Sequence, residues 1–492
     1  MVLVVWSVMG GFLSTLLSQG RTMMGDVSIT WPTTGFAHYE QLVRDLEADP
    51  SMVARATPMI ETLAMATMPD NKVVGVQVKG IDPASYAQVV DFDGAIWWRP
   101  MTEPLPRDEQ REDPRLVPEN KQRLERALAE ARGMFKTDPA TGNKVPAAIA
   151  GIELTGYSAR SKTGSGVYQK NIGLLRPEPD GSVKNVGGFA CDQNITLRVV
   201  PFDAGGREVS LVPAVFPIVN EFRVGLHEID RSFIFVELAK LQQMLKMNAG
   251  TVVSEAQSGD DFMSGETPKA NSGSVRQLPA RVTTVLVRAA KGVEPDALRE
   301  HVTKVYRSFA KGRSLDVPSP EIIEGNNLIR TWEMQNATLV GAVKKETALV
   351  LFLLWLISLV ASFLILAIFW AMISEKTKDI GTLRAIGASG PGVAGIWIGF
   401  GLILGVIGSV IGVSLAYLIV TNINPIHEWL GSALGIYVWD PRVYYFTTIP
   451  NKVEPMRALV VGLAGVGFSL LGAIIPAVRA AAMRPVTALR FE

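Results

Sequence analysis

Residues 374–390 read SEKTKDIGTLRAIGASG and stand between two long apolar stretches of the chain. The stretch before them, Thr347–Ser374, contains no charged residue, and Ala385–His427, which overlaps their end, contains no Asp, Glu, Lys or Arg. Because about 20 mostly apolar residues cross a bilayer as a helix, both stretches are predicted to span a membrane. The amphipathic segment between them is predicted to be a surface helix that offers an apolar stripe to a protein groove. An interfacial loop that only turns the chain is the alternative.

Two further uncharged stretches, Met1–Gly20 and Ala458–Val478, raise the expected number of spans to four. The first is expected to be truncated at its start. A cleaved signal peptide is the alternative for it, although the stretch lacks a basic leading region and a small-residue cleavage site. The sequence therefore predicts spans over residues 1–20, 346–374, 391–422 and 457–478.

The basic residues next to the spans predict the orientation, because short cytoplasmic segments carry an excess of Lys and Arg. The segment at 375–390 carries Lys376, Lys378 and Arg384, and the tail at 479–492 carries Arg479, Arg484 and Arg490. Both are predicted to be cytoplasmic. The loop at 423–456 and the large polar region at 21–345 are then predicted to be periplasmic.

The region 21–345 reads as a mixed α/β domain, expected as two subdomains. Strands are predicted at Ile60–Met68 and Val73–Val78, joined by a turn at 69–71, and at Arg281–Arg288, with a helix at Pro295–Phe309. Two stretches look like surface additions: Pro104–Arg132, with a helix from about Asn120, and the Gly- and Ser-rich Ser254–Ser274. The amphipathic stretch Glu333–Lys345 runs into the second span, either as a rigid lever or as a simple tether. The fold class expected is an α-helical membrane protein with four transmembrane helices and a large mixed α/β periplasmic domain.

Composition excludes several classes of function. Lys and Arg number 48 against 47 Asp and Glu, so the chain lacks the basic excess of a nucleic-acid binder. One cysteine and four scattered histidines show no metal-ligand spacing, and no paired carboxylates or nucleophile–base set stand out. No GxxxxGK[ST] phosphate loop is present, and the stretch at 161–164 (SKTG) lacks the upstream glycine spacing. We therefore expect neither a catalytic centre nor a cofactor or metal bound by this chain.

The third span carries glycines at positions 401, 405, 408 and 412, a spacing that stacks them on one helical face. Small residues allow close approach of helices in lipid. This predicts a packing face made of Gly401, Gly405, Gly408 and Gly412. Packing inside one subunit and a seam between two subunits both fit the pattern.

Two terminal motifs resemble one family. EKTKDIGTLRAIGAS, at 375–389, resembles the cytoplasmic coupling segment of the MacB/FtsX-like ABC transporter permeases, and the tail at 476–490 resembles the same family's C-terminal signature. Within that family the chain is most similar to the LolC/LolE lipoprotein-releasing permeases. The residues that carry this are Ser7–Phe12, Val224–Asp230 (VGLHEID), Phe233–Leu238 (FIFVEL), Trp332–Asn336 with Lys344–Glu346, and Tyr444–Pro450.

The resemblance implies a non-catalytic permease subunit in a bacterial inner membrane. ATP and Mg would be held by a separate LolD-like ATPase subunit. The other partners implied are a second permease chain, the same or related, a lipoprotein client, a LolA-like periplasmic carrier and membrane lipids. Mechanotransmission would run from the coupling segment through the second span to the periplasmic domain. The coupling residues expected are Glu375, Lys376, Lys378, Asp379, Ile380, Leu383, Arg384 and Ile386, with Ile380, Leu383 and Ile386 near one face.

A lipidated client needs an apolar route. Each CH₂ group buried away from water contributes about 0.8 kcal/mol of free energy, so moving three acyl chains with about 45 such groups into water would cost about 35 kcal/mol. We expect the first and second spans to line that route through Met9, Phe12, Leu16, Leu356, Val360 and Phe363. Ordinary lipid-facing or helix-packing roles are the alternative for each of them. Two other functions remain open: a MacB-type exporter of peptides or small molecules, and an FtsX-type mechanical regulator of a cell-wall hydrolase.

Overall fold

A computed structural model describes the chain except residues 70, 102–113, 139, 156, 159–166, 169–170, 178–182, 188–192, 202–209, 255–273, 314–315, 435–448, 450, 452 and 490–492. The chain divides into two compact units. One, the helical unit, holds Met1–Leu16 and the described residues from Asn336 onwards. The other, the sheet unit, holds Leu17–Gln335. Each is described by itself.

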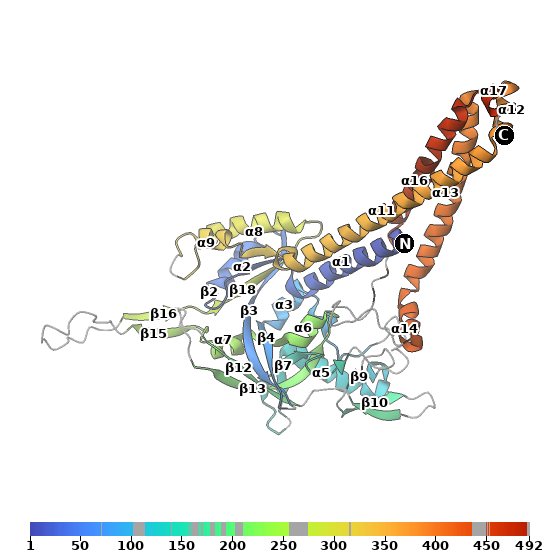
Figure 1. The fold of residues 1–492 in the computed structure, drawn as a ribbon. Coiled ribbons are helices and arrows are strands. Elements are labelled where there is room, and N and C mark those ends of the chain that lie inside the picture. The colour runs from blue at the N-terminus through green and yellow to red at the C-terminus, as the bar shows by residue number, and fades with distance from the viewer. Residues whose placement is uncertain are drawn as a thin grey trace, which may run out of the picture. The chain divides into compact units, whose positions relative to one another are not determined.

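The helical unit is built from long apolar helices (Figure 1). Three of them, α11 (Ala337–Glu375), α13 (Gly390–Thr421) and α16 (Pro455–Ala482), are long and apolar enough to cross a membrane. The first helix, α1, runs from Val2 to Met24. Its apolar part, among residues whose side chains are described, is Val2–Thr15, which is shorter than the three long helices. Three predicted spans thus correspond to observed helices, whereas a count of four is not confirmed. The described part of the unit also contains three shorter helices: α12 (Thr377–Ala385), α14 (Ile423–Leu434) and α17 (Pro485–Leu489).

Helix α16 packs against both other long helices through small residues. The hydroxyl of Ser469 donates to the carbonyl of Gly401 in α13 at 2.8 Å. The hydroxyl of Ser362 in α11 donates to the carbonyl of Phe468 at 2.8 Å. These contacts let the helices approach closely without leaving buried hydroxyls unpaired, as helices in lipid require.

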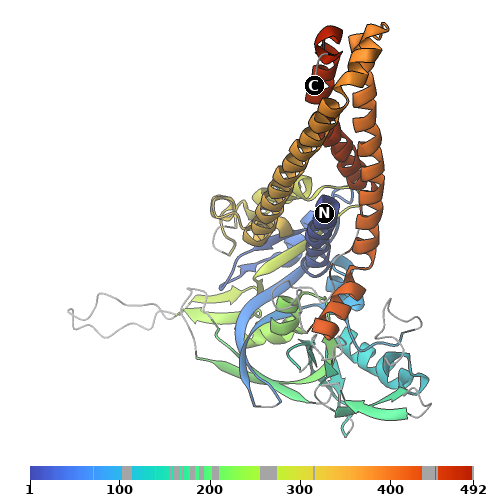
Figure 2. The same cartoon turned by 45° about the vertical axis from the view of Figure 1, so that its right-hand side comes forward.

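The sheet unit is organised around one nine-stranded sheet, in the order β12-β13-β7-β14-β4-β3-β18-β1-β19. Its strands are β12 (Asn194–Val199), β13 (Val212–Phe222), β7 (Ala148–Gly151), β14 (Phe233–Glu237), β4 (Val73–Ile81), β3 (Val53–Thr67), β18 (Thr284–Ala289), β1 (Val27–Thr30) and β19 (Ile329–Thr331). The long strand β3 pairs with β18 through its first part and with β12 through Ala64–Thr67. The second pairing closes β12, β13, β7, β14, β4 and β3 into a ring, which appears in Figure 2 as the strongly curved part of the sheet.

Helices cover much of this sheet. The helices are α2 (Tyr39–Glu47), α3 (Pro83–Val89), α4 (Phe92–Ala95), α5 (Lys121–Gly133), α6 (His227–Ser232), α7 (Leu238–Met244), α8 (Pro295–Ala310), α9 (Pro320–Gly325) and α10 (Trp332–Gln335), with short 3₁₀ turns at Pro114–Leu116 and Pro118–Asn120. One apolar cluster joins α2 and α8 to the strand residues that face them, among them Leu42, Leu298, Val27, Val285 and Ile234. Other buried aromatic side chains, Tyr86, Phe92 and Phe235, contact one another outside this cluster, and the expectation of two subdomains stays a prediction.

Within the described ranges, five two-stranded pairs lie outside the main sheet. They are β2 (Phe36–Ala37) with β17 (Arg281–Val282), β5 (Phe135–Thr137) with β6 (Lys144–Pro146), β8 (Tyr157–Ser158) with β9 (Val167–Tyr168), β10 (Asn171–Pro177) with β11 (Val183–Gly187), and β15 (Gly250–Ser254) with β16 (Ser274–Leu278). The expected addition at 254–274 lies between β15 and β16, and residues 255–273 are outside the described part. Residues 102–113 of the other addition are also outside it, but the helix expected from about Asn120 is present as α5.

Several local expectations are confirmed, and others need correction. The hairpin is formed by β3 and β4, with Asn71 in the left-handed region at φ 63°. The helix expected at Pro295–Phe309 is α8. The strand expected at Arg281–Arg288 is instead divided at Thr283, whose hydroxyl accepts a bond from the backbone N–H of Glu61 at 2.7 Å. The amphipathic stretch before the second span is also divided, since α10 ends at Gln335 and α11 begins at Ala337.

Candidate functional site

The candidate coupling site begins where α11 passes into α12. Helix α11 ends at Glu375, and Lys376 joins it to α12. The hydroxyl of Thr377 donates to the carbonyls of Ile373 at 3.0 Å and Ser374 at 2.8 Å. The last carbonyls of a helix have no partner inside the helix, so this hydroxyl satisfies two of them and fastens the start of α12 to α11.

The sequence IGASG at 386–390 ends one helix and starts the next. Gly387 has φ 110°, a conformation that glycine adopts without steric cost. The N–H of Ala388 donates to the carbonyl of Leu383 at 3.0 Å, which completes a Schellman cap on α12. Ser389 then caps α13 by accepting a bond from the N–H of Gly392 at 3.2 Å. The coupling segment is thus a nine-residue helix with defined ends. It is shorter than the surface helix that was predicted over residues 375–390.

The predicted apolar stripe of α12 divides between two environments. Ile380 is 3% exposed and packs in a cluster with Phe369, Ile373, Val393, Trp397, Ala473, Ala477 and Ala480. Leu383 is 47% exposed and Ile386 80%. Ile380 therefore anchors α12 to the three long helices, whereas Leu383 and Ile386 present apolar surface away from them.

The charged candidates surround that apolar surface. Glu375, Lys376, Lys378 and Asp379 are exposed, and the Lys376 ammonium lies 3.3 Å from the Asp379 carboxylate. Arg384 is half-buried, and its Nε has no hydrogen-bond partner among the residues that the structure describes. A Cβ built on Gly390 would lie 3.0 Å from a terminal nitrogen of Arg384, so the glycine leaves room for the guanidinium.

The C-terminal segment lies at the same end of the helical unit as α12. Helices α12 and α17 are in contact, and the Arg479 guanidinium lies 3.8 Å from the ring centroid of Trp370, near the end of α11. Figure 1 shows α12 and α17 side by side. The two basic segments predicted to be cytoplasmic are therefore on one side, as four or three spans with this order require.

The predicted glycine face is only half used for packing within the chain. A Cβ on Gly401 would lie 2.6 Å from the Cβ of Ala473, and one on Gly405 would lie 3.0 Å from the Cβ of Ser469. Cβ atoms on Gly408 or Gly412 would meet nothing within 4 Å. Gly401 and Gly405 therefore pack against α16, and Gly408 and Gly412 leave an open surface.

The predicted client groove is also divided. On α11, Leu356, Val360 and Phe363 are 44%, 63% and 60% exposed. On α1, Met9 is partly buried and Phe12 is 6% exposed, while the side chain of Leu16 lies outside the described part. Among the members whose side chains are described, those on α11 are exposed, whereas Met9 and Phe12 on α1 are partly or fully buried.

Sequence reasoning missed the structural role of Asp230. Its carboxylate accepts bonds from the backbone N–H groups of Val224 at 2.8 Å and Gly225 at 2.9 Å, closing the loop that begins the VGLHEID motif. Asp230 is 2% exposed, and burial raises its pKa to about 7, although the two backbone bonds and the charge of Arg223 act against the increase. Beside it, the His227 imidazole forms an ion-pair contact with Glu153.

An exposed apolar surface on the ring of the sheet unit also escaped prediction. Cross-strand pairing places Met65 of β3 beside Gly75 of β4 and Arg198 of β12. On the same outward face lie Leu63, Val73 and Val215, which are 73%, 52% and 61% exposed. Contiguous apolar surface of this kind marks sites of interaction. Within the described residues, no group of three or more metal-ligating side chains was found.

These features define a membrane-embedded helical protein with a defined helical end and a large α/β unit. The FtsX-like permease C-terminal family model matches residues 351–485, which include α12, α13 and α16. The resemblance to FtsX-like permeases noted in the sequence is thereby confirmed.

Curated relatives are lipoprotein-releasing system transmembrane proteins. LolC of Xylella fastidiosa (strain 9a5c) is 29% identical over 277 residues, 56% of this chain and 55% of that protein. LolC of Neisseria meningitidis serogroup B is 28% identical over 164 residues, 33% of this chain and 40% of that protein. LolE of Haemophilus influenzae is 28% identical over 130 residues, 26% of this chain and 31% of that protein. The matches thus span about half or less of each relative's length.

Proposed function

We propose that this chain is the permease subunit of an ABC transporter that extracts lipoproteins from the inner membrane and passes them to a periplasmic carrier. A separate ATPase subunit supplies the energy. The observation that carries the proposal is the construction of α12: one face is fixed to α11, α13 and α16 through Ile380, and Leu383 and Ile386 remain exposed.

The exposed part of α12 is suited to dock on an ATPase. Two apolar side chains flanked by Lys378 and Asp379 form a small amphipathic surface of the kind that enters a groove on a partner. Because Thr377 ties the start of α12 to the end of α11, a displacement of α12 moves α11 as well. Helix α11 is continuous over 39 residues, about 58 Å at a rise of about 1.5 Å per residue. It therefore serves as the lever between the ATPase and the periplasmic domain.

The exposed face of α11 supports a lipidated client. Leu356, Val360 and Phe363 form an uncharged surface along about two helical turns. Since an acyl chain is strongly disfavoured in water, the client passes from this surface to another apolar surface. The apolar patch around Met65 on the ring of the sheet unit is suited to dock the carrier that receives it. The names of the LolC and LolE relatives favour lipoprotein release over the other exported substrates considered above.

Co-purification followed by a release assay tests this function. The chain is expressed with a candidate ATPase and a candidate second permease from the same organism, reconstituted with a lipidated client, and supplied with ATP and a soluble carrier. We expect ATP-dependent transfer of the client to the carrier. The double variant Asp379→Ala/Arg384→Ala should reduce transfer, and Lys121→Ala/Glu125→Ala, which removes an exposed ion pair from α5, serves as the matched control. Normal transfer by the first variant would contradict the coupling assignment, and no transfer by the wild type would contradict the function.

A further inference from the structure

The sheet unit contains a groove of about 420 Å³ on the side of the sheet opposite α2 and α8. Its floor follows from the strand register. Thr30 of β1 pairs with Thr284 of β18, which pairs with Met59 of β3, and Glu61 of β3 pairs with Lys79 of β4. Paired residues point to the same face, and the alternate residues, such as Ile29, Val285 and Ile60, enter the core beneath α2 and α8.

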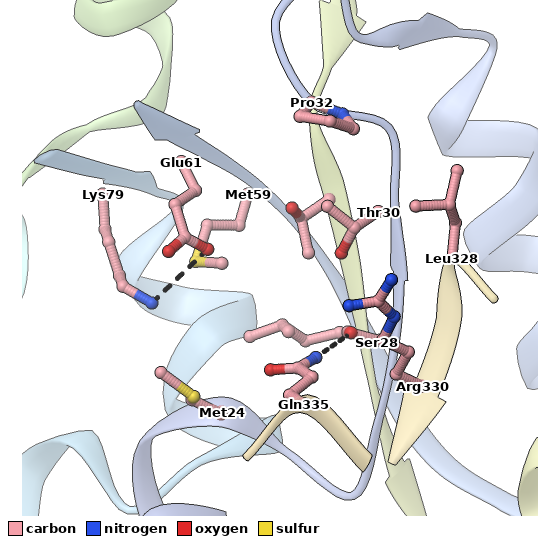
Figure 3. A pocket seen from close by; sticks show the side chains of 12 residues that line it. Met24, Ser28, Thr30, Pro32, Met59, Glu61, Lys79, Leu328, Arg330 and Gln335 are labelled. Carbon is pink, nitrogen blue, oxygen red and sulfur yellow. Dashed lines mark hydrogen bonds and ion pairs between the residues drawn. The ribbon is translucent and has the colours of Figure 1, made fainter. Parts of the chain in front are cut away.

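This polar face is buried, which is unusual for the second face of an antiparallel sheet. Ser28 and Thr284 are each 2% exposed, and Lys79 is 1% exposed. Figure 3 shows Lys79 extending towards Glu61, 3.7 Å away, and Gln335 bonded to Ser28. The hydroxyl of Thr284 has no hydrogen-bond partner among the described atoms. A buried polar group without a partner costs about 1–3 kcal/mol, so a ligand that bonds this hydroxyl would be stabilised.

The charges of the groove select the class of ligand. The Lys79 ammonium has Glu61 as its ionic partner and lies 4.5 Å from the ring centroid of Phe233. An anionic ligand would meet Glu61 and a cationic ligand would meet Lys79, whereas an amide offers both a donor and an acceptor. At the rim, the Arg330 guanidinium donates to the backbone carbonyls of Asn326 and Asn327. The remaining wall is apolar and includes Met24, Pro32, Met59, Leu286 and Leu328.

Residues that line the groove are linked directly along the chain to α1 and α11. Met24 is the last residue of α1. Gln335 ends α10 and stands two positions before Ala337, the first residue of α11. The lining therefore includes Met24, which belongs to α1, and Gln335, which is two residues before α11. Both helices are predicted to line the route of the acyl chains.

We infer that this groove binds the extended, uncharged peptide segment that directly follows the acylated residue of the client. The inference rests on the proposed function and deepens it. Acyl chains held along α11 leave the following residues at the start of the sheet unit, where the Thr284 hydroxyl and the Lys79–Glu61 pair bond the peptide amides and hydroxyls. The groove thereby recognises the linker of a lipoprotein rather than its folded part.

Site-specific photo-crosslinking in the reconstituted full complex tests the inference. A photoreactive amino acid replaces Gln335 in one preparation and the exposed Leu63 in another. With a triacylated client loaded in the absence of ATP, Gln335 should crosslink to the first residues after the acylated cysteine, and Leu63 should not. ATP and carrier should abolish the crosslink. ATP-dependent transfer without a Gln335 crosslink, or a crosslink to a phospholipid headgroup instead, would overturn the groove assignment and leave the function standing. No transfer by the wild type would overturn both.

Affinity measurements give a second, independent readout. Thr284→Val should weaken client binding about fivefold, the equivalent of one hydrogen bond of about 1 kcal/mol, while leaving the melting temperature equal or higher because an unpaired hydroxyl is removed. Thr284→Ser should restore binding, and Thr196→Val on β12 is the matched control. Clients whose linker begins with two Asp or two Lys should both bind more weakly than one with Ser and Gly. Unchanged binding by Thr284→Val, or tighter binding of either charged linker, would contradict the inference.

Discussion

The Thr377 hydroxyl donates to the Ile373 carbonyl at 3.0 Å, so the first residue of α12 is bonded to the last turn of α11. The bond is buried and has a second acceptor, Ser374, at 2.8 Å. A force applied to α12 therefore reaches α11 through a side-chain bond as well as through the backbone at Lys376. The account of coupling depends on this junction.

Replacing Thr377 with Val should uncouple the ATPase from transport. The change keeps the shape of the side chain but removes the single hydroxyl proton that the two carbonyls share, a hydrogen bond worth about 1 kcal/mol. We expect near-normal ATP hydrolysis and client transfer reduced severalfold, measured in the same proteoliposomes. Thr382→Val is the control, because its hydroxyl bonds the Lys378 carbonyl within α12 alone. An equal effect of both variants would contradict a special role for the junction.

Because Ile380 is buried and Ile386 is exposed, substitutions at the two positions should affect different properties: protein stability at Ile380 and ATPase binding at Ile386. Ile386→Asp should abolish co-purification of the ATPase without lowering the melting temperature, because the side chain is 80% exposed. Ile380→Asp should instead lower the melting temperature, since it buries a charge in an apolar cluster. Pull-down and thermal denaturation measure the two effects. Retention of the ATPase by Ile386→Asp would argue against docking at this surface.

The glycine face should show a sharp division between its two halves. Gly401→Ala should destabilise the protein by about 1–3 kcal/mol, because its Cβ would lie 2.6 Å from that of Ala473. Gly408→Ala should be neutral or stabilising by up to about 1 kcal/mol, since its Cβ meets nothing within 4 Å and alanine favours helix. Thermal melting of the detergent-solubilised chain compares them. A loss of complex assembly with Gly408→Ala alone would place a second permease chain on that half.

Asp230 should make stability depend on pH. Its folded pKa of about 7 lies above the unfolded value of 3.8, so its contribution is fully present below about pH 4 and is lost as the pH rises through 7. Asp230→Asn removes this dependence. Because Asn resembles the protonated acid, the melting temperatures of wild type and variant should be most alike near pH 4, and the wild type should fall below the variant towards pH 8. A wild type that gains stability over the variant as the pH rises would show that the carboxylate is favoured in the folded state.

A charge on the exposed face of α11 should block the client. Phe363→Glu is expected to reduce transfer at least tenfold, a cost of about 1.4 kcal/mol in binding, while membrane insertion is checked by fractionation. Ile368→Glu, about 140° away at about 100° per residue and 52% exposed, is the control for charge alone. Intact transfer with Phe363→Glu would remove that residue from the client route.

Sequence patterns were sufficient where one local signal decides the structure. Long uncharged stretches gave α11, α13 and α16, and apolar residues at helical spacing gave α8. Sequence patterns did not predict which segments far apart in the chain pair with each other. The pairing of β12 with the end of β3, which closes the ring, joins residues more than 120 positions apart, and no local pattern encodes it.

The candidate site shows the same limit. The IGASG sequence carries the cap residues that end α12 and begin α13. Ile380 and Ile386 look alike in sequence, yet packing against Phe369 and Trp397 buries only Ile380. The buried polar face around Lys79 is likewise invisible in an alternating strand, where polar residues are expected to face water.

Crosslinking from Ile386 tests the central claim most directly. A photoreactive amino acid at this position, in the intact complex in native membranes, should crosslink to the ATPase chain and be protected from reagents added on the periplasmic side. Labelling of Ile386 from the periplasmic side, or an intact, ATP-hydrolysing complex in which this position crosslinks to no ATPase, would contradict the account.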